Sequence, residues 1–220
     1  AGTALDYVRF NNMLYRVVQQ HCPDVDVVLG GISIGALRTR AALDGRLDHC
    51  FDNKGRRIGG RALDALRRSE WAAAFRRRID IVLREADYDV LDLHLYDDAE
   101  AWPAMVAMMR ETVRGKAIIV SEFGGPNLLR ETYSDLYQAR RLERYIETLR
   151  QCDIAEAFYY KLAPSSSMSR AHAGSSLLDG RLRPKPAYPV FRSFSTRDGV
   201  DVARAGPRRL SADDPAARSR

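Results

Sequence analysis

The 220-residue sequence lacks the features that mark several common classes of protein. It has no run approaching 18 consecutive apolar residues, so we expect no transmembrane helix and no membrane partner. Its three cysteines, Cys22, Cys50 and Cys152, lie far apart, without a CxxC pair or metal-ligand spacing, which argues against a disulfide framework. The sequence starts at Ala1 without a charged-then-apolar leader. We therefore expect a processed chain or a piece of a longer one.

Charge is plentiful but evenly spread. The formal net charge is +6, and arginines alternate with acidic residues on helical faces, as in "ARRLERYIETLR". This mixing is typical of a solvated surface rather than of a nucleic-acid-binding patch, so we expect no nucleic-acid partner. With 45% hydrophobic and 29% charged residues, the composition fits one globular unit.

The order of apolar patterns predicts an α/β fold. A helix over residues 5–22 is followed by strands that alternate with helices, which indicates βαβ units and a parallel sheet. We predict strands over 25–31, 89–96, 116–123 and 154–162. We predict the later helices from about Ser69, over 99–113, over 134–152 and over 185–194. The stretch between 31 and 69 reads as irregular because it is rich in glycine, and apolar periodicity stops near Ser195, so residues 196–220 are predicted to be a disordered tail.

The strand over 89–96 has one polar face, which is unusual for a parallel strand covered on both sides. Side chains alternate across a strand, so the apolar face consists of Leu91, Leu93 and Leu95. The polar face consists of Asp92, His94 and Tyr96. Burying such groups under a helix layer would be costly. In a (β/α)8 barrel, however, polar groups near the carboxyl ends of strands reach the mouth, where catalytic residues sit.

The next predicted strand ends in a carboxylate. Alternation places Ile118, Val120 and Glu122 on one face of "AIIVSEFGGPN", so the charge appears only at the last position, before a Gly-Gly-Pro turn. We expect Glu122 to lie at the mouth of a barrel. The alternative is a solvated glutamate that pairs with a nearby arginine.

Several motifs resemble, in order, the C-terminal half of a retaining glycoside hydrolase of the (β/α)8 superfamily with catalytic glutamates on strands four and seven. "DLHLY" is similar to the His-x-Tyr motif of strand six, and "IIVSEFG" to the end of strand seven. "SSLLDGRLRPKPAYPVF" resembles the segment after strand eight, and "YVRFNNMLYRVVQQHCPDVDVVLGG" resembles helix four running into strand five. The resemblance covers about residues 5–195 and implies a TIM barrel of which strands 5–8 are present.

The resemblance also implies roles. Glu122 would be the nucleophile, Tyr96 would donate a hydrogen bond that orients it, and His94 would line the sugar subsite. Where the family often has a tryptophan on strand eight, "AFYYKL" offers Tyr160 and Lys161 as substrate-binding residues, beside Tyr159. The implied activity is that of a retaining O-glycosidase acting on an oligo- or polysaccharide without a cofactor or metal. Such a mechanism needs a second carboxyl about 5–5.5 Å away.

One departure stands out: none of the nine glutamates follows an asparagine, the pattern of the family's acid/base. We therefore expect residues 1–195 to be the C-terminal half of a catalytic barrel whose N-terminal half, about 120–180 residues, is missing. A non-catalytic half-barrel that binds or assembles is the alternative. A third possibility is a divalent metal held by Asp92, His94 and Glu122. The 44–62 segment contains a "DNKG" turn but not the spacing of a calcium loop.

Overall fold

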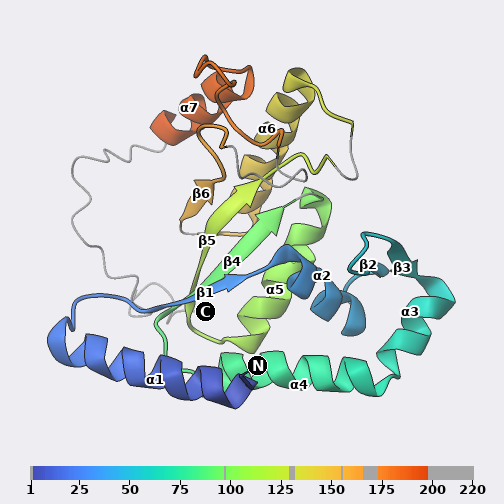
Figure 1. The fold of residues 1–220 in the computed structure, drawn as a ribbon, viewed down its shortest axis with the longest axis vertical. Coiled ribbons are helices and arrows are strands. Elements are labelled where there is room, and N and C mark those ends of the chain that lie inside the picture. Colours follow the sequence, from blue (N-terminus) through green and yellow to red (C-terminus); the bar gives the residue numbers. More distant parts are fainter. Residues whose placement is uncertain (1, 97, 129–131, 155, 166–172, 198–220) are drawn as a thin grey trace, which may run out of the picture. The chain divides into compact units, whose positions relative to one another are not determined.

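The computed structural model describes residues 2–96, 98–128, 132–154, 156–165 and 173–197, which Figure 1 draws as a coloured ribbon. The helices are α1 (Ala4–His21), α2 (Ile34–Leu43), α3 (Gly60–Arg67), α4 (Glu70–Glu85), the 3-10 turn η1 (Ala99–Ala101), α5 (Trp102–Thr112), α6 (Asp135–Gln151) and α7 (Ala187–Arg197). The strands are β1 (Val28–Ile32), β2 (His49–Phe51), β3 (Arg57–Gly59), β4 (Val90–Tyr96), β5 (Ala117–Gly124) and β6 (Ala157–Tyr159). No described helix combines the length and the apolar character needed to span a membrane.

The main sheet has the strand order β1-β4-β5-β6, and the short strands β2 and β3 form a separate antiparallel pair. Strand β6 runs parallel to β5, with Val120 opposite Ala157 and Phe123 opposite Tyr159. The register shifts between these two pairs, which marks a bulge in the ladder. The predicted α/β class with a parallel sheet is confirmed. Within the described residues the sheet stays open at β1 and β6, so the half-barrel remains a prediction.

The chain divides into two compact units. The described part of the first unit covers 2–92 and 104–119, and that of the second covers the described residues within 93–103 and 120–197. Strands β4 and β5 begin in the first unit and end in the second. The carboxyl ends of both strands, with every residue of the implied glycosidase site, therefore belong to the second unit.

In the first unit, α1 contacts α4, and the two helices overlap near one end in Figure 1. Thr3 and Asp6 form a capping box that satisfies free backbone groups at the start of α1. The amide of Asn11 donates to the carbonyl of Asp87 over 2.7 Å, and the hydroxyl of Tyr15 donates to Asp89 over 3.0 Å. These polar contacts fasten the middle of the helix to the segment that leads into β4.

The other side of α1 is apolar and exposed. Phe10, Met13, Leu14 and Val17 recur at helical spacing, and each is at least 44% exposed. Val8 on the same helix is buried, whereas Met13, Leu14 and Val17 are not. Helix α1 is thus predicted correctly as a helix, but it carries two faces, one fastened to this unit and one apolar face open to solvent.

The prediction of an irregular stretch between residues 31 and 69 is wrong. It contains α2, the β2–β3 pair and α3, and a small core forms there from Ala42, Cys50 and Leu63. The sequence does not predict helix α2 because the helix is buried around most of its circumference. It therefore lacks the alternation of an apolar and a polar face that marks a surface helix. Its buried residues are Leu37, Arg38, Ala41, Ala42 and Leu43. The predicted turn is present: Asp52 accepts hydrogen bonds from the backbone N–H groups of Lys54 and Arg56.

The second unit is built on α6, which packs against α7 and η1. Ser134 caps α6 by accepting from the N–H of Tyr137, and Trp102 stacks on Tyr145 with ring centroids 4.8 Å apart. The remaining helices and the strands β1, β4 and β5 lie where the sequence predicts them, with small shifts at their ends. Strand β6 is shorter than the predicted 154–162. Most of the predicted tail, from residue 198, lies outside the described residues.

Candidate active site at the carboxyl ends of β4 and β5

The carboxyl ends of β4 and β5 bring four polar side chains together. His94 and Tyr96 come from β4, and Ser121 and Glu122 come from β5. The strands form here because each has a fully buried apolar face: Leu93 and Leu95 of β4 are 0% exposed, as is Val120 of β5. The strand backbone is therefore a rigid support for the polar residues at its end.

Glu122 is held through one of its two carboxylate oxygens. The hydroxyl of Tyr96 donates to Oε2 over 2.6 Å, and Nδ1 of His94 lies 3.3 Å from the same oxygen. Among the described residues nothing donates to Oε1, and the side chain is 36% exposed. The carboxylate is thus fixed in orientation while one oxygen remains available.

The hydroxyl of Tyr96 stays protonated, so it remains a hydrogen-bond donor to Glu122. Burial raises the pKa of Tyr96 well above its ordinary value, and the hydrogen bond to Glu122 raises that pKa further. The phenol is only 7% exposed, so water competes little for its proton. Tyr96 therefore keeps its hydrogen through the physiological pH range and holds Oε2 throughout it.

Two glycines explain why β5 can end so close to its neighbours. A Cβ on Gly124 would overlap the carbonyl oxygen of Tyr160, and one on Gly125 would overlap the hydroxyl of Tyr145. Gly125 also has φ near +149°, a conformation that side-chain-bearing residues rarely adopt. The Gly-Gly pair after Phe123 is thus required by close packing, and it leaves Glu122 uncovered.

Tyr160 lies beside the pair, whereas Lys161 makes a different contact. The ring of Tyr160 meets that of Tyr96 edge-on, with centroids 6.4 Å apart and planes at 81°. Nζ of Lys161 donates to Oγ of Ser165 over 2.7 Å, and its backbone carbonyl accepts from Leu177. The structure therefore brings Glu122, Tyr96, His94 and Tyr160 together, and it records no contact between Lys161 and Glu122 within the described residues.

Sequence reasoning missed two residues near this site. Strict alternation would put Ser121 on the opposite strand face from Glu122, yet its Oγ lies 3.2 Å from Nε2 of His94. The register shift between Val120 and Phe123 explains this, because a bulge turns side chains away from strict alternation. Gln138 of α6 was also missed; its Nε2 lies 3.1 Å from the hydroxyl of Tyr159. No signal in the sequence reveals either contact.

Asp92 does not join this cluster as a metal ligand. Its Oδ2 accepts a hydrogen bond from the backbone N–H of Gly31 over 3.1 Å, and the side chain is 4% exposed rather than open to a barrel mouth. The described residues contain no group of three or more His, Cys, Asp or Glu side chains suited to a metal ion. The possible metal site of Asp92, His94 and Glu122 is therefore not assembled.

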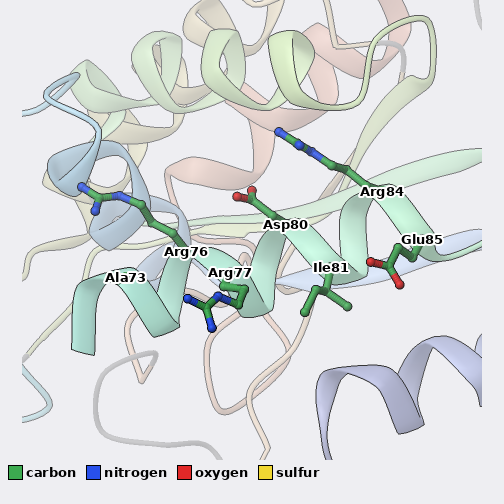
Figure 2. A pocket seen from close by; sticks show the side chains of 7 residues that line it. All are labelled: Ala73, Arg76, Arg77, Asp80, Ile81, Arg84 and Glu85. Carbon is green, nitrogen blue, oxygen red and sulfur yellow. The ribbon is translucent and has the colours of Figure 1, made fainter. Parts of the chain in front are cut away.

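A separate hollow lies on α4 in the first unit. It has a volume of about 410 Å³ and is lined by one stretch of the helix (Figure 2). Its central charges are neutralised: Arg76 pairs with Asp44 over 2.9 Å, and Asp80 pairs with Arg40 over 2.7 Å. None of the residues predicted for the active site lines it. We regard this hollow as a surface feature of a salt-bridged helix.

The sequence matches no protein-family model and no curated protein. The fold, however, resembles solved structures of glycoside hydrolases. One is a β-glucosidase, with a TM-score of 0.57 and 11% identity over 86% of this chain and 49% of that one. Another is a thermostable mutant of a xylanase from Cellvibrio japonicus, with a TM-score of 0.51 and 10% identity over 85% of this chain and 54% of that one. This chain therefore spans about half the length of these TIM-barrel enzymes.

Proposed function

We propose that this chain carries the nucleophile half of a retaining glycosidase, with Glu122 as the nucleophile. The observation that carries the proposal is that the two carboxylate oxygens of Glu122 have different partners. Oε2 is contacted by Tyr96 and His94, while Oε1 accepts no hydrogen bond from the described residues. A nucleophile needs one oxygen to be aimed and the other to be free. The likeness of the fold to glycoside hydrolases supports the same conclusion.

In this mechanism Oε1 attacks the anomeric carbon of the sugar, and the bond from that carbon to the leaving oxygen breaks. The leaving oxygen takes a proton from a second carboxyl group, which then activates the water that hydrolyses the glycosyl ester. Tyr96 keeps Oε2 in place through both steps. Tyr160 supplies an aromatic surface beside Tyr96 on which a sugar ring stacks, His94 lines the same subsite, and Lys161 contributes to substrate binding beside it.

The second carboxyl is expected from polypeptide outside these 220 residues. In the described residues the hydrogen bonds and ion pairs of Glu122 go to Tyr96 and His94, and no glutamate of the sequence follows an asparagine. The proposed partner is thus an N-terminal half-barrel that carries the acid/base. The coding sequence upstream of Ala1 tests this directly, since it should encode a strand that ends in Asn-Glu.

Covalent trapping tests the nucleophile. The product of the complete reading frame should be incubated with 2-deoxy-2-fluoro glucosyl and xylosyl fluorides, which form glycosyl esters that turn over slowly. Mass spectrometry should find the fluoro-sugar mass on the peptide that contains Glu122. Label on another carboxylate, or no label from a preparation that does hydrolyse 4-nitrophenyl glycosides, would refute the assignment.

The exposed apolar face of α1 is relevant to the missing half. Phe10, Met13, Leu14 and Val17 form a stripe that a soluble helix normally buries, and β1 leaves one edge of the sheet open. We expect the 220-residue chain alone to self-associate or aggregate, and to become monodisperse when the other half is present. A monodisperse monomer of the isolated chain that melts cooperatively, by sedimentation and calorimetry, would favour a free-standing half-barrel module instead.

A further inference from the structure

Ser121 extends the hydrogen-bonded group around Glu122 by one residue. Its Oγ lies 3.2 Å from Nε2 of His94, while Nδ1 of the same ring lies 3.3 Å from Oε2 of Glu122. Both nitrogens of one imidazole are therefore engaged, each by a neighbouring residue of β5. In a regular strand Ser121 and Glu122 would point to opposite faces. The register shift between Val120 and Phe123 brings both toward His94.

The chemistry of the three groups fixes where the protons sit. An ionised carboxylate only accepts hydrogen bonds, so Nδ1 must carry a hydrogen to bond Oε2. When the ring is neutral, Nε2 is then an acceptor, and a serine hydroxyl, which can donate as well as accept, can donate to it. The alternative tautomer would set the lone pair of Nδ1 against the carboxylate. Which nitrogen is protonated in a histidine is set by the bond that the other nitrogen makes.

We propose that Ser121 is a positioning residue that holds the ring of His94 with its Nδ1–H directed at Oε2 of Glu122. Through His94 it supplies the second donor to Oε2, so that Tyr96 and His94 together aim Oε1 at the sugar. Ser121 acts without touching the substrate. The effect on catalysis rests on the proposed function of Glu122, but the assignment of the protons does not.

Ser121 and its neighbours differ from a serine-hydrolase triad in function, although the order of contacts is similar. In a triad the serine oxygen attacks the substrate and the histidine accepts its proton. Here the exposed oxygen without a recorded donor belongs to Glu122, and Ser121 is only partly exposed. The positioning role therefore predicts no ester hydrolysis that depends on Ser121.

The first experiment reads the tautomer by NMR. Protein from the complete reading frame, labelled with ¹⁵N-histidine, should be examined at neutral pH by long-range proton–nitrogen correlation. The resonances of His94 are assigned by their loss in His94→Gln, since the sequence has only four histidines. We expect a protonated Nδ1 and an unprotonated, hydrogen-bonded Nε2. A protonated Nε2 in the parent protein would overturn the proposal.

Variants then test the part played by Ser121. In Ser121→Ala the Nε2 resonance should move toward that of an imine nitrogen without a donor, and kcat should fall about fivefold with KM unchanged, as expected for one lost hydrogen bond. Ser121→Thr keeps the hydroxyl and should restore both values. Ser193→Ala is the matched control, because that hydroxyl is exposed on α7 and donates to the carbonyl of Val190 in its own helix.

Two outcomes would overturn the role of Ser121. One is an Nε2 resonance that does not move in Ser121→Ala. The other is hydrolysis of 4-nitrophenyl acetate that disappears in Ser121→Ala but persists in Glu122→Gln, which would make the serine itself the nucleophile. Failure of the glycosidase proposal is a separate result: Glu122→Gln would then retain glycoside turnover, while the tautomer of His94 could still be as expected.

Discussion

Asp80 on α4 and Glu122 on β5 are both partly exposed carboxylates, yet their surroundings differ in kind. Asp80 lies in a hollow and faces Arg40, whose guanidinium neutralises its charge over 2.7 Å. Glu122 is held by a tyrosine hydroxyl that carries no charge and by an imidazole. In a salt bridge the opposite charge neutralises the carboxylate. A neutral donor instead orients the carboxylate without neutralising it, so the carboxylate keeps its nucleophilicity. The chemical nature of its hydrogen-bond partners, rather than a position in a surface hollow, therefore distinguishes Glu122 as the candidate nucleophile.

Replacing each carboxylate by its amide gives the largest expected difference. Glu122→Gln keeps the shape but removes the charge and the nucleophilicity, so kcat on aryl glycosides should fall by about 10⁴-fold or more. Asp80→Asn, the same chemical change in the α4 hollow, should leave kcat unchanged. Thermal unfolding should show that Glu122→Gln is folded, because this side chain is partly exposed.

Chemical rescue distinguishes a variant that has lost only the nucleophile from one that has misfolded. Glu122→Ala leaves a space that a small anion can enter, so added azide should restore part of the turnover and give a glycosyl azide. Near-normal turnover of Glu122→Gln on every glycoside that the parent cleaves would contradict the assignment of Glu122 as the nucleophile, because Glu122 would then matter no more for catalysis than Asp80.

Tyr96→Phe tests the neutral donor. The loss of one hydrogen bond to a charged group should cost about 1.5–3 kcal/mol, or roughly 10- to 150-fold in kcat. The effect should appear in kcat more than in KM, because Tyr96 contacts Glu122 rather than being assigned to the sugar. An effect as large as that of Glu122→Gln would mean that Tyr96 takes part in the chemistry directly.

Sequence patterns predicted the parts of this molecule that obey regular periodicity. The alternation in β4 correctly identified Leu91, Leu93 and Leu95 as a buried face, and Ser69 correctly marked the start of α4. The closeness of Tyr96 and Glu122 follows from neighbouring strands that end at one edge of a sheet. Their catalytic roles came from a resemblance and stay predictions.

The parts that sequence reasoning missed depend on contacts without a local signal. Helix α2 is buried on most sides and lacks an amphipathic pattern. The bulge that turns Ser121 toward His94 is a property of strand pairing, and it contradicts the alternation that was used to assign faces. Asp92 was expected at a barrel mouth but is buried, and its Oδ2 accepts a hydrogen bond from the backbone N–H of Gly31.

Tyr159 offers a second tyrosine to compare with Tyr96, because its hydroxyl contacts the amide of Gln138 rather than a carboxylate. Burial raises the pKa of Tyr159 to about 12, and the hydrogen bond with Gln138 opposes that rise. In the unfolded chain a tyrosine titrates near 10, so the stability linked to this group is complete below about pH 10 and is lost as pH rises toward 12. Between these values the parent protein should lose roughly 1–3 kcal/mol that Tyr159→Phe does not lose.

Urea unfolding at pH 8, 10 and 11.5 checks this expectation. At pH 8 the parent should be more stable than Tyr159→Phe by about 1 kcal/mol, the contribution of one hydrogen bond. The difference should shrink, and then reverse, at pH 11.5. A constant difference across the range would mean that Tyr159 ionises as readily in the folded protein as in the unfolded chain.

The smallest expected effect is that of Asp80→Asn on stability. Arg40 also pairs with Asp44, and Asp80 is 28% exposed, so removal of one charge from this surface network should cost about 0.2–1 kcal/mol. Because the pairing is electrostatic and near the surface, the loss should diminish in 1 M NaCl, where the screening length is about 3 Å. Chemical unfolding of parent and variant at low and high salt measures both points. Glu122→Gln should show no such salt-dependent loss, because the hydroxyl of Tyr96, which holds Oε2, carries no positive charge. A salt-sensitive loss at Glu122 would mean that its charge is neutralised as that of Asp80 is, which would remove the reason for assigning it the nucleophilic role.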